Sequence, residues 1–385
     1  VKMSAAGKMG FNFLGKSGLR VSNICLGTMT FGILKGSLAA CSPTYIMTSM
    51  VFECNTQLDE EKSHQILDRY VELGGNFLDT ANIYARGKSE EIIGNWLQKQ
   101  KRDRIVVATK CRFQMDASDV NKAGLSRRHI VQSVEESLAR LKTNYIDILQ
   151  AHAWDNAVPI EETLRTFNDL VRCGKIRYYG FSNVCGWQLQ KIFDFAKYNG
   201  LNQPISLQQQ YNLLCRQSEW EEFMVCKNEG IGVLPWSPLK GGLLTGKFKQ
   251  GKTPEKTQSR IGFVHTDEKR ALQSAPAWSN YSENKAYWNL VDVMGKIAAT
   301  HGKSIPQVAI RWLLQQDVVA SVIIGATSLK QLEDNMGASA GWELSKEEVA
   351  ELDTASPRMS YYPYEMIWRV NGPDRFNEFN RSIKI

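Results

Sequence analysis

Residues 59–81, DEEKSHQILDRYVELGGNFLDTA, contain the pattern that decides the fold, an amphipathic helix followed directly by a short strand. The first part carries apolar residues at helical spacing and ends in two glycines, which commonly terminate helices. The second part, 75–81, lacks strict polar alternation, as strands buried on both faces do. A chain that repeats this alternation is expected to form an α/β fold with a parallel sheet.

The alternation extends over most of the 385 residues. Eight apolar runs separated by amphipathic stretches predict one (β/α)8 barrel, a TIM barrel, as a single domain over 1–385. Ser89, followed by two glutamates, is predicted to be the N-cap of a helix. The predicted strands are 24–29, 75–81, 105–110, 146–152, 176–182, 205–210, 231–236 and 321–326. The other predicted helices are 126–142, 160–173, 187–198, 218–229, 283–301, 305–316 and 328–337.

A barrel of this type needs about 250 residues, so the chain has segments to spare. Residues 11–22 predict an N-terminal hairpin, 247–282 a long loop after the seventh strand, and 356–385 a C-terminal tail with several aromatic residues. Residues 33–56 form an apolar insertion without a clear period in the first strand-to-helix connection. A mobile lid and a segment without function are both open interpretations of this insertion.

Composition and charge narrow the class of protein. The net charge is +7, and the sequence contains no run of five basic residues. Neither a nucleic-acid nor a membrane partner is therefore expected. The eight cysteines form no C-x-x-C pair and no zinc-type cluster with histidine, so no metal site is predicted. No apolar run reaches about 18 residues, and no secretory signal opens the sequence. A cytoplasmic protein is therefore expected.

Polar side chains occur where several of the predicted strands end. Asp79 ends the second strand, Lys110 the third and His152 the fourth. Because catalytic groups of such barrels gather at the carboxyl ends of the strands, these side chains are expected around one opening. The later strands contribute Ser182, Asn183, Gln208 and Trp236.

Tyr84, five positions after Asp79, completes a set that can protonate a carbonyl oxygen. A phenol has an ordinary pKa of about 10, and a nearby lysine cation lowers it by favouring the phenolate. Asp79 is expected to hold Lys110 charged and in place, and His152 to orient the carbonyl. These residues therefore predict a general acid, Tyr84, that protonates a carbonyl oxygen as a hydride reaches its carbon.

These residues lie in motifs that follow one another in a set order, each behind its own strand. Over about residues 11–355 the chain resembles the aldo-keto reductase superfamily, in a branch that includes bacterial-type reductases and the potassium-channel β-subunits. The resemblance implies reduction of small aldehydes or ketones with NADPH, by a catalytic tetrad of Asp79, Tyr84, Lys110 and His152. The motifs are FLDTANIY (77–84), GKSEEIIGNWL (87–97), VVATK (106–110), DILQAH (147–152), GFSN (180–183), LQQQYNLL (207–214), WSPLKGGLLTGK (236–247) and IIGATSLKQLEDN (323–335).

The resemblance also implies which residues bind the cofactor. Residues of this sequence match the family's contacts to three parts of NADPH: the nicotinamide, the pyrophosphate and the adenosine. In many members the position of Thr327 or Gln331 is basic and binds the 2′-phosphate; here only the adjacent Lys330 is basic, so NADH use stays open. The matched residues are Ser182, Asn183, Gln208 and Trp236 for the nicotinamide, Ser237, Leu239, Lys240, Gly241 and Arg260 for the pyrophosphate, and Gly325, Thr327, Gln331, Asp334 and Asn335 for the adenosine.

Three residues suggest the substrate. Arg86, Arg112 and Trp154 each lie two positions after a member of the tetrad. We hypothesise that this basic and aromatic rim suits polar or acidic carbonyl compounds, such as sugar-derived ketoaldehydes, alongside small aromatic aldehydes. The alternative is that both arginines are solvated loop residues. No protein partner can be identified from the sequence.

Three other interpretations compete. YARGK (84–88) spells the Tyr-x-x-x-Lys of short-chain dehydrogenases, but that motif needs both residues on one helix face, and Gly87 places Tyr84 in a loop. GGLLTGKF (241–248) resembles a P-loop, but Phe248 stands where Ser or Thr would reach magnesium. A cofactor-binding, redox-sensing subunit with little turnover, like a channel β-subunit, remains an alternative function, because such subunits can keep the tetrad.

Overall fold

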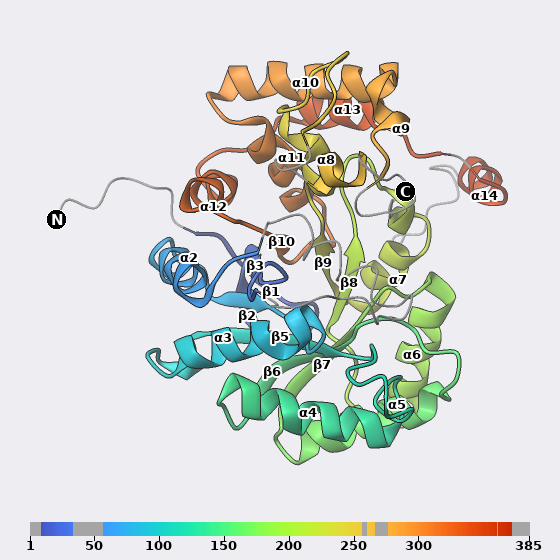
Figure 1. The fold of residues 1–385 in the computed structure, drawn as a ribbon. Helices are drawn as coiled ribbons and strands as arrows, with labels where there is room; N and C mark the ends of the chain where they lie inside the picture. Colours follow the sequence, from blue (N-terminus) through green and yellow to red (C-terminus); the bar gives the residue numbers. More distant parts are fainter. Residues whose placement is uncertain (1–8, 34–56, 256–259, 266–275, 360, 372–385) are drawn as a thin grey trace.

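The computed structural model describes residues 9–33, 57–255, 260–265, 276–359 and 361–371 (Figure 1). Its centre is an eight-stranded parallel sheet in which β10 lies beside β3, and each later strand lies beside the next one in the chain. A parallel bridge between Val233 and Val319 brings the two edges together, so the predicted barrel is confirmed. The strands are β3 (Ile24–Gly27), β4 (Phe77–Asp79), β5 (Val106–Cys111), β6 (Ile146–Ala151), β7 (Ile176–Ser182), β8 (Ser206–Gln210), β9 (Gly232–Trp236) and β10 (Val322–Ile324).

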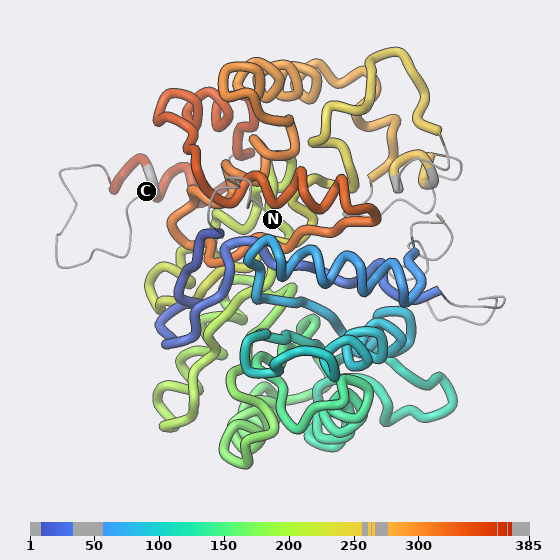
Figure 2. Tube along the Cα trace, turned by 90° about the vertical axis from the view of Figure 1, so that its left-hand side faces the viewer, coloured from blue at the N-terminus to red at the C-terminus, as the bar shows by residue number. Residues whose placement is uncertain are grey.

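Helices pack around the outside of the strands in both views (Figures 1 and 2). The ring of helices closes where α2 (Glu60–Glu72) meets α12 (Leu329–Met336), joined by an ion pair of 2.8 Å between Arg69 Nε and Glu333 Oε1. One helix, α13 (Lys346–Ala355), was not predicted. Besides α2 and α12, the predicted helices are α3 (Lys88–Leu97), α4 (Arg127–Leu141), α5 (Ile160–Arg172), α6 (Gly186–Tyr198), α7 (Glu222–Glu229), α10 (Lys285–His301) and α11 (Ile305–Leu314).

The prediction of Ser89 as an N-cap is wrong. Gly87, with φ at 91°, precedes the first helical residue of α3. The Ser89 hydroxyl is buried, donates to the carbonyl of Thr28 at 2.9 Å and lies 3.0 Å from the Thr80 hydroxyl. The side chain therefore joins the helix to the residues that directly follow β3 and β4 instead of capping its first turn.

The segments outside the barrel agree in part with expectation. The hairpin is confirmed, with β1 (Phe11–Phe13) antiparallel to β2 (Arg20–Ser22). The predicted loop over 247–282 is wrong in part, because it contains the short helices α8 (Arg260–His265) and α9 (Ser279–Ser282). The C-terminal tail contains α14 (Tyr364–Val370). Of the predicted insertion 33–56, residues 34–56 lie outside the described residues, so its role stays untested.

Side chains alternate between the interior and the exterior of the barrel along each strand. Leu78 belongs to the large apolar cluster shared with the helices, whereas Phe77 and Ala108 belong to a smaller cluster inside the barrel. Asp79 and Lys110 come two residues after Phe77 and Ala108 on the same strands, so their side chains also point into the barrel. The interior therefore changes from apolar to charged toward the carboxyl ends of the strands.

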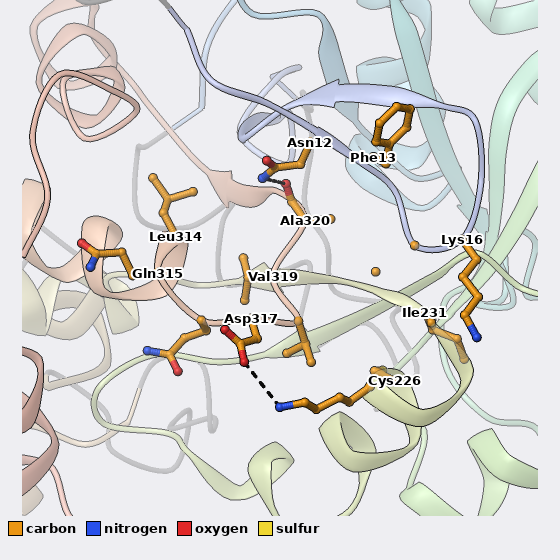
Figure 3. A pocket seen from close by; sticks show the side chains of 16 residues that line it. Asn12, Phe13, Lys16, Cys226, Ile231, Leu314, Gln315, Asp317, Val319 and Ala320 are labelled. Carbon is orange, nitrogen blue, oxygen red and sulfur yellow. Dashed lines mark hydrogen bonds and ion pairs between the residues drawn. The ribbon is translucent and has the colours of Figure 1, made fainter. Parts of the chain in front are cut away.

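The hairpin closes the opposite end of the barrel. Leu14 and Val21 pack in the interior cluster with the first residues of the strands. A pocket of about 600 Å³ lies there, between the hairpin, the start of β9 and residues 314–320 (Figure 3). Two of its lining residues, Lys227 and Asp317, form an ion pair at 3.4 Å. The predicted catalytic residues all lie at the other end.

Candidate active site

The carboxyl ends of β4 and β5 bring Asp79 and Lys110 together inside the barrel. Lys110 Nζ lies 2.6 Å from Asp79 Oδ2 and 2.8 Å from the carbonyl oxygen of Thr80, and both charged side chains are buried. The third contact of the ammonium group is the Tyr84 hydroxyl at 3.4 Å. An ammonium has three N–H donors, and these three acceptors use all of them. Three of the four predicted catalytic residues therefore meet at one nitrogen atom.

The charge of Lys110 is maintained by its partners. Burial by itself lowers the pKa of Lys110, because a buried ammonium loses its hydration. The negative charge of Asp79 and the hydrogen bonds to Asp79 and Tyr84 outweigh that effect, and the pKa is raised above its ordinary value. The ammonium is therefore charged at neutral pH and faces the phenol.

Tyr84 begins a short 3-10 turn, η2 (Tyr84–Gly87), outside helix α3. Ala85 and Arg86 in this turn have φ of 47° and 53°, in the left-handed region that non-glycine residues rarely occupy. Such a conformation costs about 1–3 kcal/mol per residue and persists only where the surroundings fix it. Tyr84 therefore lies outside the helix and shares no helix face with Lys88. This agrees with the prediction that Gly87 places Tyr84 in a loop.

The ion pair between Arg140 and Glu90 supports this turn. A Cβ atom on Gly87 would meet Arg140 Cδ at 2.7 Å, so the backbone lies directly on that side chain. Arg140 Nε is 2.7 Å from Oε2 of the fully buried Glu90, whose other oxygen accepts from the Thr109 hydroxyl at 2.5 Å. Thr109 is the neighbour of Lys110, so one network holds both the turn and the strand.

His152 follows β6 and faces the same group of residues. Its ring contacts Tyr84 and Phe113 edge-on, with centroid separations of 5.8 and 4.7 Å. Burial, and then the charges of Lys110 and Arg112, lower the pKa of His152 well below its ordinary value. Its Nδ1 has no hydrogen-bond partner among the described residues. The imidazole is neutral at neutral pH, with one N–H to donate.

Two buried amides complete the network. Gln208, predicted as a cofactor contact, donates from Nε2 to Asp79 Oδ1 at 2.7 Å. Gln150 on β6 donates to the same oxygen at 3.2 Å and was missed in the sequence. The signal was present, because Gln150 precedes His152 by two residues and strand side chains alternate with that period.

Three residues predicted to bind the nicotinamide carboxamide are neighbours. Asn183, with φ at 53°, donates to Ser182 Oγ at 2.9 Å and to the carbonyl of His152 at 2.8 Å. Ser182 is paired with Gln208 in the sheet. Trp236 ends β9, and within the described part of the chain its buried indole N–H has no hydrogen-bond partner. The four predicted residues therefore lie on or directly after three successive strands: Ser182 and Trp236 end β7 and β9, Asn183 follows β7, and Gln208 is the middle residue of β8.

The predicted pyrophosphate loop continues from β9. Ser237, Lys240 and Gly241 have φ of 57°, 47° and 64°, so with Leu239 they form a tight turn that leads into the 3-10 segment Lys240–Thr245. Lys240 is buried, burial lowers its pKa, and Nζ lies 3.5 Å from Gln210 Oε1. No carboxylate pairs with it among the described residues. A buried cation without a carboxylate fits a pyrophosphate.

The residues predicted for the adenosine end lie in and before α12. Gln331 Oε1 accepts from the amide and hydroxyl of Thr327 at 2.9 and 3.0 Å. Asp334 accepts from the Ser304 hydroxyl at 2.9 Å and so faces α11. Arg260 begins α8, and its side chain lies outside the described part of the chain. The two remaining members, Asn335 and Gly325, are joined by a hydrogen bond of 3.4 Å.

The three predicted substrate residues differ in position. Arg86 is exposed on the turn after Tyr84, and Trp154 packs edge-on against Trp187 at 5.7 Å. Arg112 is half-buried, its charge acts on His152, and the structure shows no hydrogen bond or ion pair from its side chain to a described residue. Of the three, Arg112 is the one whose charge lowers the pKa of a predicted catalytic residue, His152.

The described residues do not support a P-loop, a metal site or a membrane-spanning helix. Phe248, in the P-loop-like stretch, stacks on Trp278 with a centroid separation of 5.2 Å and so belongs to the packing. Within the described ranges no three side chains gather as metal ligands. No helix in those ranges has the length and apolar character needed to cross a bilayer.

Comparison with known proteins identifies the family. Residues 23–357 match the model described as Aldo/keto reductase family. Versiconal hemiacetal acetate reductase of Aspergillus parasiticus is 33% identical, over 91% of this chain and 98% of that protein. Aldo-keto reductase dtxS3 of Metarhizium robertsii is 34% identical, over 89% of each chain. A probable voltage-gated potassium channel subunit beta of Arabidopsis thaliana is 34% identical, over 86% of this chain and 91% of that protein, which confirms the predicted branch. The chain therefore belongs to the aldo/keto reductase family and is an oxidoreductase.

Proposed function

We propose that this oxidoreductase reduces aldehydes and ketones to alcohols with NADPH, and that Tyr84 delivers the proton. The observation that carries the proposal is the buried contact chain from Asp79 through Lys110 to the Tyr84 hydroxyl, with distances of 2.6 and 3.4 Å. A phenol beside a fixed ammonium can release its proton, because the phenolate that remains is stabilised. This is the chemistry that a carbonyl oxygen needs when its carbon is reduced.

Each residue has one step in this reaction. NADPH, when bound, supplies the hydride that forms the new C–H bond. Tyr84 donates its O–H proton to the carbonyl oxygen as the C=O double bond becomes single, and Lys110 balances the phenolate. His152, neutral because of its lowered pKa, donates an N–H to the same oxygen and orients it. Asp79 holds Lys110 in place.

The residues present fit a nicotinamide dinucleotide. Trp236 offers an aromatic surface for the nicotinamide, and Lys240 offers a buried positive charge for the pyrophosphate. Neither Thr327 nor Gln331 can neutralise a 2′-phosphate, but the exposed Lys330 stands between them in the chain. We infer that NADPH is preferred and that NADH is also used.

A turnover assay tests this function directly. Consumption of NADPH, and separately of NADH, is measured against a panel of small aliphatic and aromatic carbonyl compounds. We expect turnover with both cofactors and a higher kcat/KM with NADPH. The alternative is a regulatory role, because some relatives are named potassium channel subunits. Tight NADPH binding with negligible turnover of every compound would favour that alternative.

We further propose that the substrates include acidic carbonyl compounds, such as sugar-derived ketoaldehydes, and that Arg112 binds their anionic group. The Arg112 guanidinium lies over the Phe113 ring at 5.5 Å, and its buried Nε has no hydrogen-bond partner among the described residues, so an anion would replace hydration that this N–H has lost. Arg112 also lies close enough to His152 for its charge to lower the pKa of that residue. An anion held there would place the carbonyl near Tyr84.

Replacing Arg112 by Ala should separate acidic from neutral substrates. A hydrogen bond to a charged group contributes about 1.5–3 kcal/mol, so kcat/KM for an acidic ketoaldehyde should fall about tenfold to a hundredfold. For the matching amide the change should stay within about threefold. Arg86→Ala should have the smaller effect, because Arg86 is exposed. Equal changes on the acid and the amide would contradict the assignment of Arg112.

A further inference from the structure

We propose that Gln150 is a positioning residue that fixes the Asp79 carboxylate, so that the barrel interior sets the direction of the Lys110 ammonium. The proposal rests on the proposed function, because it concerns how the proton donor is held. Gln150 lies outside the catalytic and cofactor sets predicted from the sequence. Its effect on the reaction is transmitted through Asp79.

The two oxygens of Asp79 have different partners. Oδ2 accepts from Lys110 at 2.6 Å, whereas Oδ1 accepts from Gln150 at 3.2 Å and Gln208 at 2.7 Å. A carboxylate only accepts, so both amides must present their N–H₂ groups to it. These contacts come from strands β5, β6 and β8, which hold the carboxylate from three directions.

The two amides also fix each other. Gln208 Nε2 lies 3.4 Å from Gln150 Oε1, so the carbonyl of Gln150 accepts from the same group that binds Asp79. Gln150 is fully buried and Gln208 nearly so. Inside a protein such bonds are strong, and an unpaired partner is costly, so the network has one satisfied arrangement. That arrangement leaves Oδ2 for Lys110.

This arrangement matters for the proton donor. The Lys110 ammonium has the carboxylate, the Thr80 carbonyl and the Tyr84 hydroxyl as its acceptors. If the carboxylate rotated, the ammonium would follow its stronger partner and its contact with the phenol, already 3.4 Å long, would lengthen. A displacement of about 1 Å can cost about a hundredfold in rate. Gln150 acts by preventing that rotation.

Replacing Gln150 by Met removes the donor and keeps the length of the side chain. The rate of hydride transfer, measured in a single turnover with saturating NADPH, should fall about tenfold to a hundredfold. KM for the carbonyl and Kd for NADPH should change little, because Gln150 reaches neither in this arrangement. Gln209→Met is the matched control. Gln209 is a buried amide on β8 that donates to the Val184 carbonyl at 2.8 Å.

Gln150→Glu provides a readout that a general loss of packing would not give. When ionised, Glu at this position repels Asp79; when protonated, its O–H can donate to Oδ1 as the amide does. The rate relative to the unchanged protein should therefore be lowest at high pH and recover as the pH falls. The Met variant has no titrating group and should show no such recovery.

The outcomes are distinguishable. A normal rate in Gln150→Met would overturn the proposal, as would an equal loss in Gln209→Met with the same fall in thermal midpoint. Absence of acid recovery in Gln150→Glu would also overturn it. Each of these results leaves the role of Tyr84 intact, which is judged by the Tyr84→Phe variant and not by Gln150.

Discussion

Tyr84→Phe is expected to lower kcat by about 10²–10⁴-fold, the contribution that a positioned general acid makes. The ring remains and keeps its contact with His152, but the hydroxyl that Lys110 faces is lost. Binding of NADPH should change by less than about twofold, because Tyr84 is not among the proposed cofactor contacts. The measurement combines steady-state consumption of NADPH with a fluorescence titration of cofactor binding.

Tyr179→Phe is the matched control for this experiment. Tyr179 is buried on the outer face of β7, and its hydroxyl donates to the carbonyl of Asn202. Removing that hydroxyl should cost about 1 kcal/mol of stability and leave kcat unchanged. If Tyr84→Phe retained kcat within a few-fold of the unchanged protein, the proton would have to come from another group, and the proposed mechanism would be wrong.

Lys110→Met should be the most destabilising single change in the site. It leaves the Asp79 carboxylate buried without its cation, which costs about 3–5 kcal/mol when one partner of a buried pair is removed. Turnover should be lost as well, because nothing then stabilises the Tyr84 phenolate. Urea denaturation reports the free energy of unfolding, and the NADPH assay reports turnover.

The double variant Asp79→Asn with Lys110→Met tests whether the pair serves catalysis or stability. Replacing both charges by neutral groups is often nearly neutral for stability. The new amide oxygen can still accept from Gln150 and Gln208. We therefore expect the double variant to regain most of the free energy of unfolding while staying inactive. A double variant as unstable as Lys110→Met would show that the buried charges themselves are not the cause of the loss.

Much of the barrel and of its catalytic end could be predicted from the sequence. Short apolar runs without polar alternation marked the strands, because parallel strands covered on both faces have that composition. The residues Asp79, Lys110 and His152 stood at the ends of those runs, where the fold places reactive groups. The same two-residue period would have pointed to Gln150, but it does not tell which interior amide reaches the carboxylate.

Other features depended on contacts between distant segments. Ser89 reads locally as a cap, yet its hydroxyl bonds to Thr28, far away in the chain. The left-handed turn at Ala85 and Arg86 has no signal of its own, because those residues disfavour it, and the next residue, Gly87, lies directly on the side chain of Arg140, which is distant in the chain. The short helices α8 and α9 have six and four residues, too few to show the repeating apolar face that a helix prediction needs.

The change from apolar to charged residues along the interior of the barrel restricts where this chain can vary in length. Deleting a single residue within β4 would bring Leu78 or Thr80 into the place of Asp79, since neighbouring side chains point to opposite faces. An added or lost residue in a connection leaves that parity intact. Insertions such as the one between β3 and α2 are therefore compatible with the chemistry, whereas the strands themselves cannot gain or lose even one position.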